Sequence, residues 1–248
     1  MAVSHAPHPR VGKPGPFGFW KTLGLGVVIV MAFLLAQVLV AVAFAIIWKG
    51  RLDIQSVGVD GLLMALAVLI SAPVAVGLVL LMVRRRPGMS VRAYLALYPI
   101  SPGQALRWAL LVVGLAMAWN LLTAALGRPV IPHFMVELYR NAESLPLLWV
   151  AVVVAAPIAE ETVFRGFIFK GFRHSPLGPT GATILTALAW AALHLQYDLY
   201  GIVTVFGAGL LLGAARHLTH SLYAPLLMHA LWSFIALTEV AVHVQRTG

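Results

Sequence analysis

The sequence predicts an all-α polytopic membrane protein with about seven transmembrane helices, its N-terminus in the cytoplasm and its C-terminus outside. Composition carries the class: of 248 residues, 61% are hydrophobic and only 10% are charged, whereas a soluble domain has about 25% charged residues. Uncharged apolar runs recur along the chain. They match the ~20 residues that a helix needs to cross the hydrocarbon core, and they lack the alternating polarity of barrel strands.

Each uncharged apolar run is interpreted as one span. The spans are expected at residues 22–48, 61–83, 107–127, 146–171, 179–197, 199–216 and 221–241. Between the second and third spans, the segment after three arginines is expected to form an interfacial helix bounded by Pro87 and Pro102. Gly209 and Gly213, four residues apart in the sixth span, predict close helix packing.

The distribution of charge predicts the orientation. Residues 1–21 hold four prolines and three cations, and are expected to be a disordered basic cytoplasmic tail. With this tail inside, eleven of the 17 Lys and Arg residues fall in cytoplasmic segments and five on the other side, leaving Arg165 in the membrane. This split agrees with the positive-inside rule. The net charge of +9 is therefore attributed to topology and lipid head groups, and nucleic-acid binding is not expected.

Three ionisable residues lie inside the fourth apolar run. Glu160, Glu161 and Arg165 would each cost at least ~2.5 kcal/mol in the bilayer, so they indicate function or pairing. Glu161 and Arg165 are four residues apart and can pair on one helical face. Glu160 points about 100° away, without a partner in its own helix. An unpaired carboxylate there suits a general base or a proton carrier.

Two of the nine histidines lie within apolar runs, where imidazole normally faces the bundle interior. These are His194 and His229, and both follow the glutamates in the chain. Trp190 is four residues before His194, and Ser233 is four residues after His229, so each shares its histidine's face. The other histidines are expected in the tail, at span ends or outside the membrane. The sequence thus predicts a shared site on three helices.

These motifs resemble a known family. "EETVFR" with Glu160, "WAALH" with His194 and "HALWS" with His229 match, in order and spacing, the three motifs of the CPBP family of intramembrane endopeptidases. That family includes CAAX prenyl proteases, bacteriocin-processing (Abi) proteins and myxosortases. The resemblance covers roughly residues 145–240. It implies a catalytic core at 145–241, with residues 22–144 as accessory helices and loops.

The resemblance also implies roles for individual residues. Glu160 with His194 would activate a water to attack a peptide carbonyl, while His229 and Ser233 would stabilise the oxyanion. Glu161, Arg165 and Trp190 would be supporting residues. Two positions depart from the usual pattern. Trp190 stands where phenylalanine is common, and Ser233 stands where asparagine is frequent.

Several alternatives stay open. A zinc site built from glutamate and histidine is less favoured than metal-free catalysis because HExxH is absent. A non-catalytic binding or immunity protein would use the same pocket, and a proton-linked transporter is a third reading. The expected partner is a membrane-anchored protein or peptide. Composition rich in Ala, Leu, Val and Arg fits the cytoplasmic membrane of a bacterium.

Overall fold

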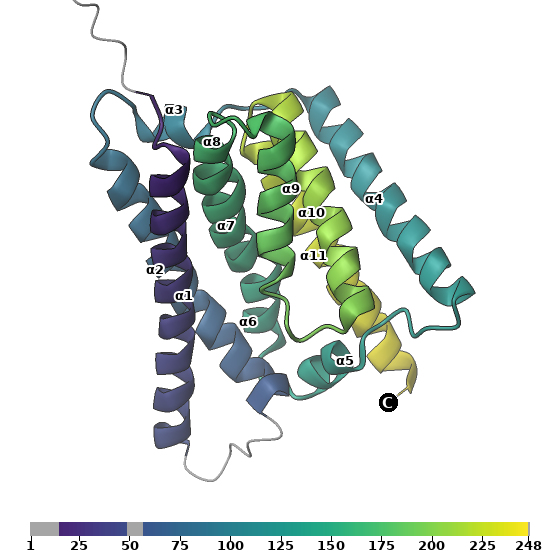
Figure 1. Cartoon of the computed structure of the whole chain (residues 1–248). Coiled ribbons are helices and arrows are strands. Elements are labelled where there is room, and N and C mark those ends of the chain that lie inside the picture. Colours follow the sequence, from purple (N-terminus) through teal and green to yellow (C-terminus); the bar gives the residue numbers. More distant parts are fainter. Residues whose placement is uncertain (1–14, 49–56, 248) are drawn as a thin grey trace, which may run out of the picture.

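The computed structural model of the chain describes residues 15–48 and 57–247, and in that part every regular element is helical (Figure 1). The all-α prediction is therefore confirmed. The elements are α1 (Phe19–Ile47), η1 (Val57–Val59), α2 (Gly61–Arg84), α3 (Val91–Leu95), α4 (Pro102–Ala125), α5 (His133–Arg140), α6 (Leu145–Trp149), η2 (Val150–Ala155), α7 (Ala156–Glu161), η3 (Thr162–Ile168), α8 (Phe169–Phe172), α9 (Gly178–Ala191), α10 (Leu199–Thr219) and α11 (Tyr223–Thr247).

Six helices of the described part are long and apolar enough to span a membrane. They are α1, α2, α4, the continuous helix Leu145–Phe172, α10 and α11. The predicted span 179–197 is the exception, because α9 has only 14 residues and ends at Ala191. At 1.5 Å per residue it reaches about 21 Å, which is less than the ~30 Å hydrocarbon core.

When the shorter α9 is counted with the six long helices, successive helices run in alternating directions (Figure 1). α9 runs back between the central helix and α10, so it takes the place of the missing span in the up-and-down order. The start of α1 and the C-terminus consequently lie at opposite ends of the bundle (Figure 1). This agrees with the odd number of crossings that the sequence predicts. Which end faces the cytoplasm stays a prediction from charge.

The described end of the predicted tail belongs to the fold. Residues 1–14 lie outside the described part, but Phe17 is 6% exposed and packs against Tyr94 and Phe167. The guanidinium of Arg86 donates to the carbonyl of Gly15. Tail disorder is therefore wrong for residues 15–21. Aromatic packing, which composition alone does not reveal, holds this segment.

The predicted interfacial helix between Pro87 and Pro102 is α3, which is little more than one turn. Ser90 caps its start by accepting from the Ala93 N–H. Tyr94 and Leu95 are buried, and both belong to the main apolar cluster of the bundle. α3 therefore covers one end of the core.

Glycines bring α9 and α10 together. A methyl group built on Gly209 would lie 3.0 Å from the Cβ of Ala187, and one on Gly213 would lie 2.7 Å from the Thr183 Cγ2. Both neighbours belong to α9. Close packing at this small-residue pair, as expected from its spacing, lets α10 support the helix whose end carries Trp190.

Candidate active site

The central helix Leu145–Phe172 carries the two glutamates, and it is not a regular α-helix. η2 and η3 are π-helical turns on either side of α7. Pro157 in α7 supplies no N–H to the helical ladder, which accounts for irregularity just before the glutamates. π-helical turns are rare and are frequent at functional sites. η3 begins immediately after Glu161.

The two neighbouring glutamates differ in environment. The side chain of Glu161 is fully buried, whereas that of Glu160 is 23% exposed. The difference follows from the turn of about 100° between successive helical residues. Glu161 is enclosed by protein, and Glu160 remains accessible to a reactant.

Glu161 pairs with two groups from different parts of the chain. Its Oε1 is 2.9 Å from Arg165 Nη1 and 2.9 Å from His229 Nδ1. Arg165 is fully buried, and its Nη2 also donates to the carbonyl of Gly209 at 3.2 Å. The predicted pair between Glu161 and Arg165 is present. The link to α11 through His229 adds a long-range contact that spacing did not predict.

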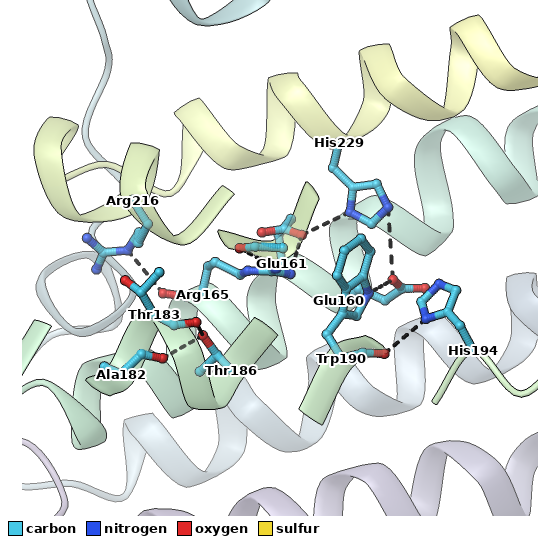
Figure 2. A network of polar contacts seen from close by, with 11 residues as sticks. Glu160, Glu161, Arg165, Ala182, Thr183, Thr186, Trp190, His194, Arg216 and His229 are labelled. Atoms are coloured by element: carbon cyan, nitrogen blue, oxygen red, sulfur yellow. Dashed lines mark hydrogen bonds and ion pairs between the residues drawn. The ribbon is translucent and has the colours of Figure 1, made fainter. Parts of the chain in front are cut away.

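Glu160 is held by residues of α9 and α11. The indole N–H of Trp190 donates to Glu160 Oε2, and His229 Nε2 lies 3.9 Å from the same oxygen. Figure 2 shows His229 between the two glutamates, with one ring nitrogen toward each. Because an ionised carboxylate only accepts, His229 Nδ1 must donate to Glu161. Nε2 is left to face Glu160.

The contacts close into a ring of five side chains. The Arg165 guanidinium lies 4.6 Å from the centre of the Trp190 ring, which connects the two pairs. The ring contains Glu160, Trp190, Arg165, Glu161 and His229. The partly exposed Glu160 and the buried Glu161 are thus parts of one network.

His194 lies outside the helix in which it was expected. It follows α9, three residues beyond Ala191, and its Nδ1 is 2.9 Å from the carbonyl of Trp190. The carbonyl only accepts, so Nδ1 carries the proton and Nε2 is left with a lone pair in the neutral ring. No hydrogen bond joins His194 to Glu160 in the described structure. Both side chains instead border Trp190 (Figure 2).

Ser233 lies on α11, one turn after His229, and is half-buried. Among the described residues, its hydroxyl makes no hydrogen bond to the network of Glu160. The structure therefore brings together six of the seven predicted residues around Trp190, and leaves Ser233 beside them.

Arg216 supports the network and was not predicted as a site residue. It was counted among the cytoplasmic cations, yet it is 1% exposed. Its Nε–H donates to the main-chain carbonyl of Arg165 at 3.0 Å, inside η3 (Figure 2). Its guanidinium lies 5.5 Å from the centre of the Phe169 ring. The sequence did not distinguish Arg216 as a site residue, because cations are common at the ends of apolar runs.

A cavity of about 520 Å³ begins at Trp190 and extends away from the glutamates between α4, α10 and α11. The segment after α9 forms part of its wall through Gln196, Tyr197 and Asp198. Non-helical backbone at membrane depth is tolerated where it lines such a cavity. Trp190 belongs both to the wall and to the network, so the cavity reaches the edge of the site at this residue.

The described ranges contain no cluster of side chains that is suited to bind a metal ion. Within 15–48 and 57–247, no three His, Asp or Glu side chains are grouped closely enough to hold an ion. Glu161 Oε1 is already shared between Arg165 and His229. The expected metal-free chemistry stays a prediction.

Comparisons with known proteins agree with the motif reading. Residues 142–235 match the family model described as type II CAAX prenyl endopeptidase Rce1-like. A stretch of 114 residues is 33% identical to an uncharacterized 24.3 kDa protein of Escherichia coli, covering 44% of this chain and 52% of that protein. The match thus spans about half the length of this relative. No solved structure matches the chain.

The matched segment contains all seven predicted site residues, from Glu160 to Ser233. It includes the central helix, α9, α10 and the first half of α11. Residues 142–235 are therefore similar to the type II CAAX prenyl endopeptidase Rce1-like family over the part of the chain that holds the predicted site.

Proposed function

We propose that this protein is an intramembrane endopeptidase in which Glu160 activates the attacking water. The observation that carries the proposal is the position of the Glu160 carboxylate. It is partly accessible, it is fixed by the Trp190 N–H, and it faces an imidazole nitrogen of His229. A general base needs this combination of orientation and access.

The reaction follows from these groups. Glu160 takes a proton as a water oxygen attacks the carbonyl carbon of a peptide bond, forming a tetrahedral oxyanion. Nε2 of His229, held by the bond from Nδ1 to Glu161, stabilises that oxyanion when it carries a proton, with Ser233 as a second donor. Collapse breaks the C–N bond as Glu160 returns the proton to the leaving amine. The free Nε2 of His194 assists Glu160 in activating the water.

The substrate is proposed to be a membrane-anchored protein or peptide. The site lies inside a helical bundle that is apolar enough for the bilayer, and the cavity extends from Trp190 of the site toward one end of the bundle. On the charge-derived orientation, this end faces outward in a bacterial cytoplasmic membrane. Cleavage is then expected toward the outer side.

A comparison of proteomes tests this function. Membrane and secreted fractions from cells with the wild-type chain are compared with those from cells with Glu160→Gln at equal abundance. The proposal predicts new peptide termini only with the wild type. A zinc chelator and its non-chelating isomer are expected to leave cleavage equally intact; selective loss with the chelator would indicate a metal enzyme instead.

The second candidate is a non-catalytic binding or immunity protein that holds a partner in the same cavity. Ser233 favours it, because a serine hydroxyl reaches less far toward an oxyanion than the asparagine that is frequent at this position of the family motif. A cellular phenotype that survives in the double variant Glu160→Ala, His194→Ala would support binding. Loss of both phenotype and cleavage would support proteolysis.

A further inference from the structure

The cavity wall contains a carboxylate that the proposed reaction does not use. Glu239 lies on α11 ten residues after His229, which places it about 15 Å further along the helix. Asn120 of α4 donates to its Oε1 at 2.7 Å. No cation of the described part pairs with Glu239. Its second oxygen is therefore available to a donor from a ligand.

The other charges of the cavity wall are balanced. Arg128 is paired with Asp198 at the rim, which leaves Glu239 as the carboxylate in excess when His133 is neutral. Arg246 borders a smaller neighbouring cavity of about 370 Å³ that Glu239 also lines, but forms no ion pair with it. The larger cavity thus contains one carboxyl group, that of Glu239, without a cationic partner among the described residues.

Aromatic side chains surround the same space. The wall includes Trp119, Phe134, Tyr197, Tyr200 and Trp232. Faces of Trp and Tyr rings attract cations. One face is already used in this way, because the Arg128 guanidinium lies 4.7 Å from the centre of the Tyr200 ring. The wall therefore combines two features that favour a cation, a carboxylate and aromatic faces.

We propose that this cavity binds an organic cation, the guanidinium or ammonium group of a substrate side chain, and that Glu239 determines this specificity. Asn120 is the positioning residue that holds the carboxylate. The proposal rests on the proposed function only in treating the cation as part of the substrate. A volume of about 520 Å³ falls within the ~300–1,000 Å³ usual for ligand sites.

The geometry also sets the position of the cation in a peptide. The ~15 Å between the levels of His229 and Glu239 corresponds to about four residues of extended chain. An arginine or lysine about four residues from the cleaved bond would reach Glu239 while the carbonyl lies beside Glu160.

Binding can be measured without proteolysis. The purified full chain in nanodiscs of neutral lipid is titrated with octylguanidinium and with uncharged octylurea, using fluorescence of the cavity tryptophans. The wild type and Glu160→Gln are expected to prefer the cation by about tenfold, the effect of one charge-assisted hydrogen bond. Glu239→Gln should lose that preference, whereas Glu137→Gln, which removes a charge outside the cavity wall, should keep it.

The two probes partition into the lipid to the same extent for every variant, because the nanodiscs are identical. Differences in binding between variants therefore do not arise from the lipid. Equal binding of both probes by the wild type would overturn the proposal even if Glu239→Gln failed to fold. Persistence of the preference in a folded Glu239→Gln protein would overturn it as well. Cation preference without cleavage would instead retain the cation site and reject the protease function.

Peptides then test the link to the substrate. Replacing an arginine about four residues from the cleaved bond by citrulline should raise KM about tenfold for the wild type and leave kcat unchanged. In Glu239→Gln, the two peptides should have equal KM. A KM for the wild type that does not respond to this replacement at any position would contradict the proposal.

Discussion

α1 and the central helix have nearly the same length and opposite environments. α1 has 29 residues and the central helix has 28. In an apolar stretch of 18 residues, however, 11% of the residues are buried in α1 and 44% in the central helix. α1 has one charged residue, Lys21, near its start. The central helix holds buried Glu161 and Arg165, because α9 contributes the Trp190 ring, α10 the Gly209 carbonyl and α11 the His229 imidazole as partners. Ionisable residues thus occur where neighbouring helices enclose them.

The largest effect is expected when one buried charge of the central helix is removed. Arg165→Met leaves Glu161 buried without its guanidinium, so we expect a loss of about 3–5 kcal/mol in the free energy of unfolding. Reversible unfolding in mixed micelles measures it. Val38→Ala, on the exposed face of α1, is the control and should change stability by no more than about 0.5 kcal/mol. Equal effects of the two changes would contradict the contrast.

A second test concerns the closeness of the helices around Arg165. In Gly209→Ala, the new methyl group meets Ala187 at 3.0 Å and Arg165 Nη2 at 3.2 Å, so we expect a loss of about 1–3 kcal/mol. Gly207→Ala in the same helix meets no atom within 4 Å and should be neutral or slightly stabilising. Thermal unfolding of both variants checks the difference. A neutral Gly209→Ala would show that α9 and α10 are not tightly packed there.

A third test concerns the single hydrogen bond from the Trp190 indole to Glu160. Trp190→Phe removes the N–H that holds Glu160 while keeping an aromatic ring, and we expect kcat to fall up to about tenfold. Trp119→Phe is a matched control, because Trp119 Nε1 has no hydrogen-bond partner among the described residues. Its kcat should be unchanged, and any effect of this cavity-wall residue should be on KM. Equal kcat values for the two variants would mean that the Trp190 bond does not orient Glu160.

The smallest expected effect concerns Tyr197 at the cavity wall. Burial, and secondly the nearby Glu160 charge, raise the pKa of Tyr197 to about 12. The folded value lies above the unfolded value of about 10, so the phenol destabilises the fold only as pH rises from about 10 towards 12. From about pH 6 to pH 9 the phenol keeps its proton, so Tyr197→Phe removes no group that titrates there. The shape of the pH–activity profile should therefore be unchanged in this range. A new inflection in that range would contradict it.

The sequence predicted much of this arrangement from residue spacing. The helical class and six of the spans follow from uncharged apolar runs, and the pairing of Glu161 with Arg165 follows from their separation. The end of α9 could not be predicted, since the apolar pattern continues through Leu193 and Leu195 beyond Ala191.

Long-range contacts account for the remaining differences. The bond from His229 to Glu161 joins residues 68 positions apart, and the bond from Arg216 supports a carbonyl in η3. Neither contact leaves a periodic pattern in the chain. Local spacing identified the groups in the site, but tertiary packing decides which group holds which.

The central claim is that Glu160 performs the chemistry while its buried neighbour holds the network. The most direct measurement is kcat of purified Glu160→Gln on a substrate identified in the proteome comparison. The glutamine can still accept from Trp190, so the fold and thermal midpoint should match the wild type. Loss of the base should lower kcat by about a thousandfold. A folded Glu160→Gln protein that cleaves within about tenfold of the wild-type rate would contradict the claim.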